Sequence, residues 1–309
     1  MDTKNVIAAI SLSAAVIILY SLFFAPSPNE LKKIDEQKSS MSSEAPKLEE
    51  SEKIVELSRD QALKESNRVE FENQNIKGSI SLMGGTIDDL IFKNYTETLD
   101  GKNKITLLNP KKYSEGYFVE TGWVSSSKNI ELPSSNTSWK VEGNNKLTPG
   151  NPVTLVWNNN QGISFKKKIK IDEKFLFSID QIITNQSEKS YDFYAYGQII
   201  RNKSPEVTNF YILHEGLIGV FNDQLVEKDY DDIEEKEFSQ KAETGWLGIT
   251  DKYWITTLIP EKNKEFRADF NFKNKFRANF IETKPLELGS KGTVSSNVRV
   301  IVAAKEVDV

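Results

Sequence analysis

The run from Val6 to Ala25 constrains this chain more than any other feature, because it contains no charged side chain. The hydrocarbon core of a bilayer is crossed by about 20 consecutive apolar residues in helical form. No other stretch of the chain approaches that length without a charge. A core helix of this size would carry a polar face, whereas here only Ser11, Ser13 and Ser21 interrupt the apolar residues. The run therefore predicts one membrane span at residues 6–25.

A cleaved signal peptide is the alternative to a retained anchor. Cleavage sites carry small residues, but this run ends in Phe23-Phe24-Ala25-Pro26. We therefore favour an uncleaved anchor. Lys4 precedes the span, and Lys32 and Lys33 follow it, so the distribution of positive charge leaves its direction open.

The residue types that are rare or absent exclude several kinds of chemistry. Cysteine is absent, which excludes disulfides, thiolate metal sites and a cysteine nucleophile, and His214 is the single histidine. The acidic run Asp229–Glu237 lacks the EF-hand spacing, and we interpret it as a solvated loop. The net charge is −5 with both signs interspersed, unlike the basic footprint of a nucleic-acid binder. We predict no catalytic residue, no cofactor, no metal site and no nucleic-acid partner.

The segment that follows the apolar run, residues 26–67, has the composition of a tether. It is rich in Ser, Glu and Lys and poor in large apolar residues, so it buries too little surface to offset the entropy of ordering. Near its end, Ser58 and Gln61 have the spacing of a capping box. This spacing predicts a short helix near residues 58–66.

From residue 68 onward the apolar pattern changes to a period of two, which is typical of half-buried strands. The pair Gly84-Gly85 indicates a turn between two strands, because glycine accepts positive φ freely. We expect residues 203–243 to be irregular. Regularly spaced strands with turn signals predict an all-β fold of two antiparallel sheets packed face to face over residues 68–305.

The strand predicted near residue 163 shows the alternation most clearly. Ile163, Phe165, Ile169 and Ile171 share one face, which we expect to be buried. The opposite face carries Ser164, Lys166, Lys168 and Lys170. We interpret the lysine run as the solvated face of an antiparallel strand and not as a basic binding patch.

Several segments resemble the YidC family of membrane protein insertases, of the YidC/Oxa/Alb type. They are LSRDQALKESNRVEF, GSISLMGGTIDDLIFKNY, FYILHEGLIGV and GWLGITDKYWITTLIP, in that order along the chain. The ITDKYW part is most similar to alphaproteobacterial members. The resemblance extends from the N-terminal anchor through the family's first periplasmic domain.

This resemblance implies a large β-supersandwich, galactose mutarotase-like, that stands in the periplasm of a bacterial inner membrane. Residues 1–5 would then be cytoplasmic. The family inserts and folds nascent inner-membrane proteins, alone or with the Sec translocon and its SecDF accessory. Its insertion groove belongs to a later bundle of five spans, so residues 306–309 would begin the link to a core that we do not find in this chain.

Two hypotheses of function follow. In the first, the chain carries the docking or chaperone-like domain of an insertase and is not an enzyme. In the second, it is a membrane-tethered sugar- or peptide-binding sandwich. Mutarotase catalysis is disfavoured in either case, because it needs a pair of histidines with a carboxylate and this chain has His214 alone.

The segment Gly245–Pro260 contains the candidate site. Trp246, Asp251, Lys252 and Tyr253 could contact a partner such as SecDF. Alternatively, the aromatic residues, together with Ile249 and Trp254, could pack inside the sandwich, with Asp251 paired to Lys252 at a strand end. We favour packing, because large aromatic side chains are usually buried.

Overall fold

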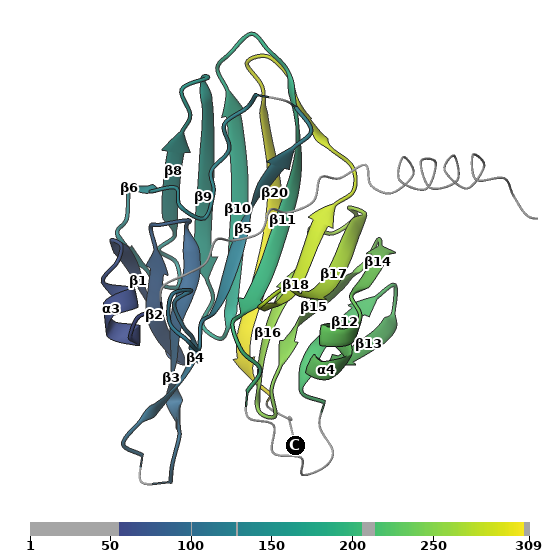
Figure 1. Cartoon of the computed structure of the whole chain (residues 1–309). Coiled ribbons are helices and arrows are strands. Elements are labelled where there is room, and N and C mark those ends of the chain that lie inside the picture. The colour runs from purple at the N-terminus through teal and green to yellow at the C-terminus, as the bar shows by residue number, and fades with distance from the viewer. Residues whose placement is uncertain (1–55, 100, 128, 206–213, 306–309) are drawn as a thin grey trace, which may run out of the picture. The chain divides into compact units, whose positions relative to one another are not determined.

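We analysed a computed structural model of the chain, which describes residues 56–305 except residues 100, 128 and 206–213 (Figure 1). The predicted span 6–25 and most of the tether lie outside the described residues. Among those residues, no helix combines the length and the apolar character that crossing a bilayer requires.

The larger of two sheets has eleven strands. Nine of them follow the order β14-β17-β18-β11-β5-β3-β2-β1-β7, while β4 pairs with β3 and β19 with β11. Their bounds are β1 Arg68–Glu72, β2 Ile76–Ser81, β3 Thr86–Thr96, β4 Lys104–Leu108, β5 Tyr117–Ser125, β7 Lys146–Leu147, β11 Tyr191–Arg201, β14 Phe238–Ala242, β17 Phe266–Phe272, β18 Phe276–Glu282 and β19 Leu286–Leu288.

The smaller sheet has nine strands in the order β13-β12-β15-β16-β20-β10-β9-β8-β6, all paired antiparallel. Their bounds are β6 Lys140–Glu142, β8 Val153–Asn158, β9 Ile163–Ile171, β10 Leu176–Asn185, β12 Gly216–Phe221, β13 Gln224–Asp229, β15 Gly245–Thr250, β16 Trp254–Ile259 and β20 Thr293–Ala304. The all-β fold predicted from the sequence is confirmed.

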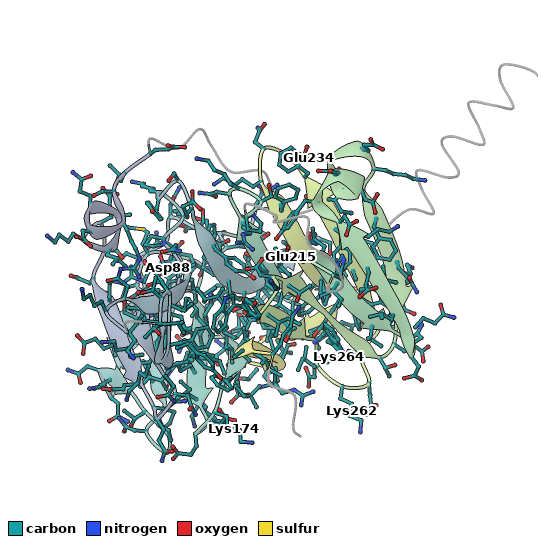
Figure 2. The ribbon with its side chains drawn as sticks, turned by 90° about the horizontal axis from the view of Figure 1, so that it is seen from below. Asp88, Lys174, Glu215, Glu234, Lys262 and Lys264 are labelled. Carbon is teal, nitrogen blue, oxygen red and sulfur yellow. The ribbon has the colours of Figure 1, made fainter. Side chains whose placement is uncertain are left out.

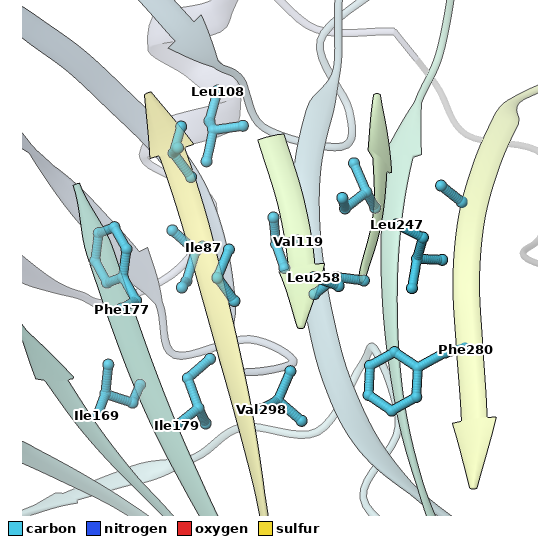
Figure 3. Packing of buried hydrophobic residues seen from close by; sticks show 14 of the residues in the cluster. Ile87, Leu108, Val119, Ile169, Phe177, Ile179, Leu247, Leu258, Phe280 and Val298 are labelled. Carbon is cyan, nitrogen blue, oxygen red and sulfur yellow. The ribbon is translucent and has the colours of Figure 1, made fainter. Parts of the chain in front are cut away.

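One core cluster joins the inner faces of both sheets. Ile169, Ile179 and Val298 reach it from the smaller sheet, and Val119 and Phe280 from the larger one (Figure 3). The period-two pattern places these side chains on one face of each strand. Burying each such side chain contributes about 1.5–3 kcal/mol to the free energy of folding, so this core holds the two sheets together.

The predicted capping box is present. Helix α3 spans Arg59–Leu63, the Ser58 hydroxyl accepts a hydrogen bond from the Gln61 amide, and the Gln61 side chain accepts one from the Ser58 amide. The helix is shorter than expected and ends at the cap residue Lys64. The turn at Gly84-Gly85 is also confirmed, with φ of 77° and 63°.

Two expectations about residues 203–243 are wrong. This stretch contains strands β12, β13 and β14, so it is not irregular throughout. The acidic run is not a loop either, because it includes helix α4, which spans Tyr230–Glu235. Tyr230 and Ile233 are both buried, and their spacing of three residues puts them on one face of the helix. The acidic side chains of the run are exposed, so it is solvated as expected, but the buried Tyr230 and Ile233 hold it as a helix.

Candidate functional site

The candidate residues lie at the turn between strands β15 and β16. The Asp251 amide donates to the carbonyl oxygen of Trp254 at 2.8 Å, which closes the hairpin. The Lys305 amide donates to the Tyr253 carbonyl oxygen at 2.8 Å. The last described residue of the chain therefore lies directly beside this turn.

The hairpin presents an aromatic ring and a cation to solvent. Tyr253 is 58% exposed, and the Lys252 ammonium lies 5.1 Å from the centre of its ring. Trp246 is half-buried. The packing hypothesis is confirmed for Ile249, which is fully buried, and for Trp254, whose ring stacks on Phe92 at 4.8 Å. It is wrong for Tyr253.

Asp251 does not pair with Lys252, contrary to the packing hypothesis. Its carboxylate lies 2.5 Å from the Arg201 guanidinium, and both side chains are largely buried. Arg201 also donates to the Tyr230 hydroxyl at 3.1 Å and lies 4.7 Å above the Tyr117 ring. A buried guanidinium needs a buried anion more than an exposed ammonium does, which explains the different pairing.

This cluster changes the acidity of its own members. Burial, followed by the charge of Asp251, raises the pKa of Tyr117. Burial also raises the pKa of Tyr230, against the opposing effect of Arg201. Both phenols are therefore neutral at physiological pH.

The segment before strand β12 also stabilises the turn. The backbone amide of Lys252 donates to the Glu215 carboxylate at 2.8 Å (Figure 2 labels Glu215).

A second polar region lies on the outer face of the larger sheet, away from the core. Four side chains stand opposite one another in register on strands β5, β11, β18 and β17, and we name them the polar row: Glu120, Gln198, Asn279 and Asp269. Neighbouring side chains in such a register are about 5 Å apart. Gln198 donates to Glu120 at 2.8 Å, and Asn279 donates to Asp269 at 3.3 Å.

Ion pairs continue this polar surface toward strand β1. Arg68 pairs with Asp88, and Arg59 pairs with Asp89 at 2.5 Å. Burial raises the pKa of Asp88 to about 6, although Arg68 opposes the shift. Figure 2 shows Asp88 among the N-terminal strands. Within the described residues no group of acidic side chains and histidine could hold a metal ion.

A small cavity opens beside Glu120. It is lined by Trp139, Ser135, Tyr196 and Lys167, among others. The ammonium of Lys167 comes from the smaller sheet and donates to the carbonyl oxygen of Thr121 at 2.7 Å.

Two further carbonyl oxygens, those of Gly84 and Gly85, accept from Lys167 at 3.3 and 3.4 Å. An ammonium has three donors, so these three carbonyls match it. Burial lowers the pKa of Lys167 from 10.5 to about 8, against the opposing effect of Glu120.

Lys167 is a residue that the sequence reasoning missed. It is 3% exposed and lies between Phe165 and Ile169 on the inner face of strand β9. Lys166, Lys168 and Lys170 lie on the other face, as predicted. The period of two already assigned Lys167 to the buried face, so the signal was present in the sequence.

Solved structures similar to this one share its fold. One is the galactose mutarotase related enzyme of Lactobacillus acidophilus, with a TM-score of 0.51 and 11% identity over 79% of this chain and 100% of that one. Another is a galactose mutarotase-like protein of Lactobacillus casei, with a TM-score of 0.52 and 10% identity over 77% of this chain and 100% of that one. At such low identity the likeness shows the galactose mutarotase-like fold alone.

A family described as the YidC periplasmic domain matches residues 68–309. The chain belongs to the YidC family. The membrane protein insertase YidC of Pelagibacter ubique is 53% identical over all of this chain and 56% of its own length. That of Mesorhizobium japonicum is 38% identical over 82% of this chain and 43% of its own length. The chain thus spans about half the length of these two YidC relatives. Both confirm the alphaproteobacterial resemblance.

Proposed function

We propose that this chain supplies the periplasmic part of a membrane protein insertase that inserts and folds inner-membrane proteins. The observation that carries the proposal is the identity of 53% over the full chain to a relative named as an insertase. In this proposal residues 6–25 form a retained anchor in the inner membrane with residues 1–5 in the cytoplasm. Residues 26–67 are then the tether, and residues 68–305 stand in the periplasm.

The domain's role in this proposal is docking and not catalysis. The bilayer, nascent inner-membrane proteins and the Sec translocon with SecDF are the proposed partners. The β15–β16 hairpin supports a contact, because Lys252 and Tyr253 are exposed beside Lys305, the last described residue. Asp251 has a different part, since it is buried against Arg201 and holds the turn in place.

A chimera tests the proposed function. The full 309-residue chain is joined to the part of the Pelagibacter ubique insertase that follows the matched region. We expect this chimera to restore growth and inner-membrane protein insertion in cells depleted of their own insertase. A chimera that is produced and reaches the membrane, but leaves insertion at the depleted level, would contradict the proposal.

The hairpin contact needs its own test. In the same chimera, Lys252→Glu and Tyr253→Ser remove the exposed cation and ring without touching the buried Asp251. We expect co-purification with SecDF to fall about tenfold, because an aromatic ring at an interface can contribute more than 1 kcal/mol to binding. Leu225→Ser is the matched control, because Leu225 is also apolar and 59% exposed but lies on strand β13. Equal losses in the control, or none in the hairpin variants, would exclude this contact.

A further inference from the structure

The outer face of the smaller sheet is divided into an apolar part and a charged part. On strands β12, β15, β16, β20 and β10, side chains that enter the core alternate with side chains that point away from it. Six of the outward side chains are apolar and half-buried, and we name them the apolar face: Ile218, Val220, Trp246, Ile259, Ile301 and Leu176. On the next strand, β9, the same side of the sheet carries Lys166, Lys168 and Lys170. Apolar side chains are therefore concentrated on one half of this surface.

The strand register arranges the apolar face as two adjacent rows. The first row consists of Val220, Trp246 and Ile259. The second row consists of Ile218, Ile301 and Leu176, with the small residues Gly248 and Thr257 between the first two. Neighbouring strands lie about 4.8 Å apart, and side chains on one face of a strand follow one another at about 6.7 Å. Five strands and two rows therefore make the apolar face about 19 Å long and about 7 Å wide.

The position of these strands in the sheet determines what kind of segment can bind. Each of the five strands is paired with a neighbour on both sides (Figure 1). An extended peptide that adds its backbone to a sheet needs an unpaired edge, so such a peptide cannot bind here. A helix satisfies its backbone hydrogen bonds internally and can contact a surface through side chains alone. A helix of about 13 residues is about 19 Å long, which matches the apolar face.

Side chains of opposite charge lie at opposite ends of the apolar face. Glu227 of the edge strand β13 stands opposite Ile218 and is exposed. Arg299 of β20 stands opposite Ile259 and is also exposed. One end is therefore complementary to a cation and the other to an anion. The membrane segments of inner-membrane proteins are apolar helices, and their Lys and Arg residues are concentrated at the cytoplasmic flank, so such a helix has the matching asymmetry of charge.

We propose that the apolar face binds an apolar helical segment of an inner-membrane protein, with the basic flank of that segment beside Glu227. Contiguous apolar side chains on an outer surface are typical of interaction sites, and Trp246 supplies the largest ring surface among them. This inference rests on the proposed function and deepens it, because it names the part of the nascent protein that the domain holds. The surface differs from the β15–β16 hairpin, since Trp246 lies near the start of β15 and the turn follows its other end.

A peptide titration of the full chain tests this inference without requiring insertion. The chain is placed in phosphatidylcholine nanodiscs, and fluorescence anisotropy follows a labelled peptide of about 13 residues, with leucines on one helical face and a pair of lysines at one end. Empty nanodiscs measure binding to lipid, which is subtracted. We expect saturable binding, and binding about tenfold weaker for a peptide of the same composition whose leucines form no helical stripe. Equal binding of the two peptides, or none beyond that of empty nanodiscs, would overturn the inference.

This test is independent of the chimera that tests the proposed function. The chimera reports insertion in cells, whereas the titration reports binding by the chain alone. Failure of the proposed function and failure of this inference are therefore distinguishable.

Variants then locate the surface that binds the peptide. Trp246→Ser should lower the affinity about tenfold, because aromatic rings contribute most to such contacts. Ile182→Ser is the matched control and should change nothing, since Ile182 is also apolar, half-buried and on the outer face, but stands between Lys166 and Ser295. Thermal unfolding of each variant checks the fold. Equal losses in folded Trp246→Ser and Ile182→Ser would contradict the inference.

The charge at the end of the apolar face is tested with Glu227→Lys. This variant should lower the affinity for the lysine-ended peptide about fivefold and raise it for a peptide that ends in glutamates. The same loss with both peptides would contradict the proposed orientation of the helix. A second copy of the chain is the other possible occupant, and sedimentation of the chain in detergent detects it. A dimer that Trp246→Ser dissociates would overturn the inference.

Discussion

Arg201 and Lys167 are both buried cations, but the protein holds them in different ways. Arg201 lies 2.5 Å from the carboxylate of Asp251 and against two phenols. Lys167 donates to three backbone carbonyls, and its ring contact is with Trp139, 5.1 Å away. One cation is therefore neutralised by an anion, whereas the other is solvated by neutral dipoles.

This difference indicates which of the two cations can lose its charge while the domain stays folded. A guanidinium stays protonated at any physiological pH, so Arg201 always requires Asp251. An ammonium can release its proton when burial disfavours the charge, and the pKa of Lys167 is lowered to about 8. Near the β15–β16 hairpin the domain is therefore stabilised by an ion pair that keeps its charges. Near the polar row it is stabilised by Lys167, a cation that can become neutral.

The largest expected effect is that of Asp251→Ala. This change leaves Arg201 buried without its anion, so we expect the free energy of unfolding to fall by about 4 kcal/mol. Denaturant unfolding of the variant and the parent chain measures the change. Glu188→Ala is the control, because Glu188 forms an exposed ion pair with Lys291 and should cause no measurable loss. Equal effects in the two variants would remove the distinction between buried and surface pairs.

Lys167→Met should have a smaller effect. Methionine keeps the apolar volume but leaves three carbonyl oxygens without their donor, and it also removes the cost of burying a charge. We expect these terms to leave a net loss of about 2 kcal/mol in the free energy of unfolding near neutral pH. Lys168→Met on the opposite face of strand β9 is the control. If Lys167→Met lowers the free energy of unfolding as much as Asp251→Ala does, the carbonyl dipoles around Lys167 matter as much to stability as the carboxylate beside Arg201.

Only part of this comparison could be predicted from the sequence. The strand alternation and the Ser58 cap are local, so the sequence determines them directly. Lys167 was missed, although the same alternation puts it on the buried face of β9, and its carbonyl partners depend on how the two sheets pack. Arg201 and Asp251 are distant in the chain, and charge alone suggested Lys252 as the partner of Asp251.

The polar row was harder still to predict. Glu120, Gln198, Asn279 and Asp269 become neighbours only through the strand order of the larger sheet. The sequence contains the outward-facing parity of each residue, but not which strands lie side by side. Helix α4 was missed for a related reason, because its buried Tyr230 packs against Phe276 of a distant strand, with the ring centres 4.6 Å apart.

A pH series sharpens the comparison further. Unfolded Lys167 binds its proton with a pKa near 10.5 and folded Lys167 with a pKa of about 8. Between these values the unfolded chain binds more protons, so stability rises with pH. Relative to Lys167→Met, we expect the parent chain to gain about 1 kcal/mol between about pH 7.5 and pH 9. A flat difference would show that the three carbonyls keep Lys167 charged throughout this range.

The smallest expected effect is that of Trp139→Phe. This change keeps a ring beneath the Lys167 ammonium and removes the indole N–H that has no partner among the described residues. The weaker cation–π contact and the lost donor act in opposite directions, so we expect a change of about 0.5 kcal/mol or less in the free energy of unfolding. Trp139→Leu removes the ring as well and should cost more. If Trp139→Phe destabilises the chain as much as Trp139→Leu does, the indole N–H has a hydrogen-bond acceptor in solution.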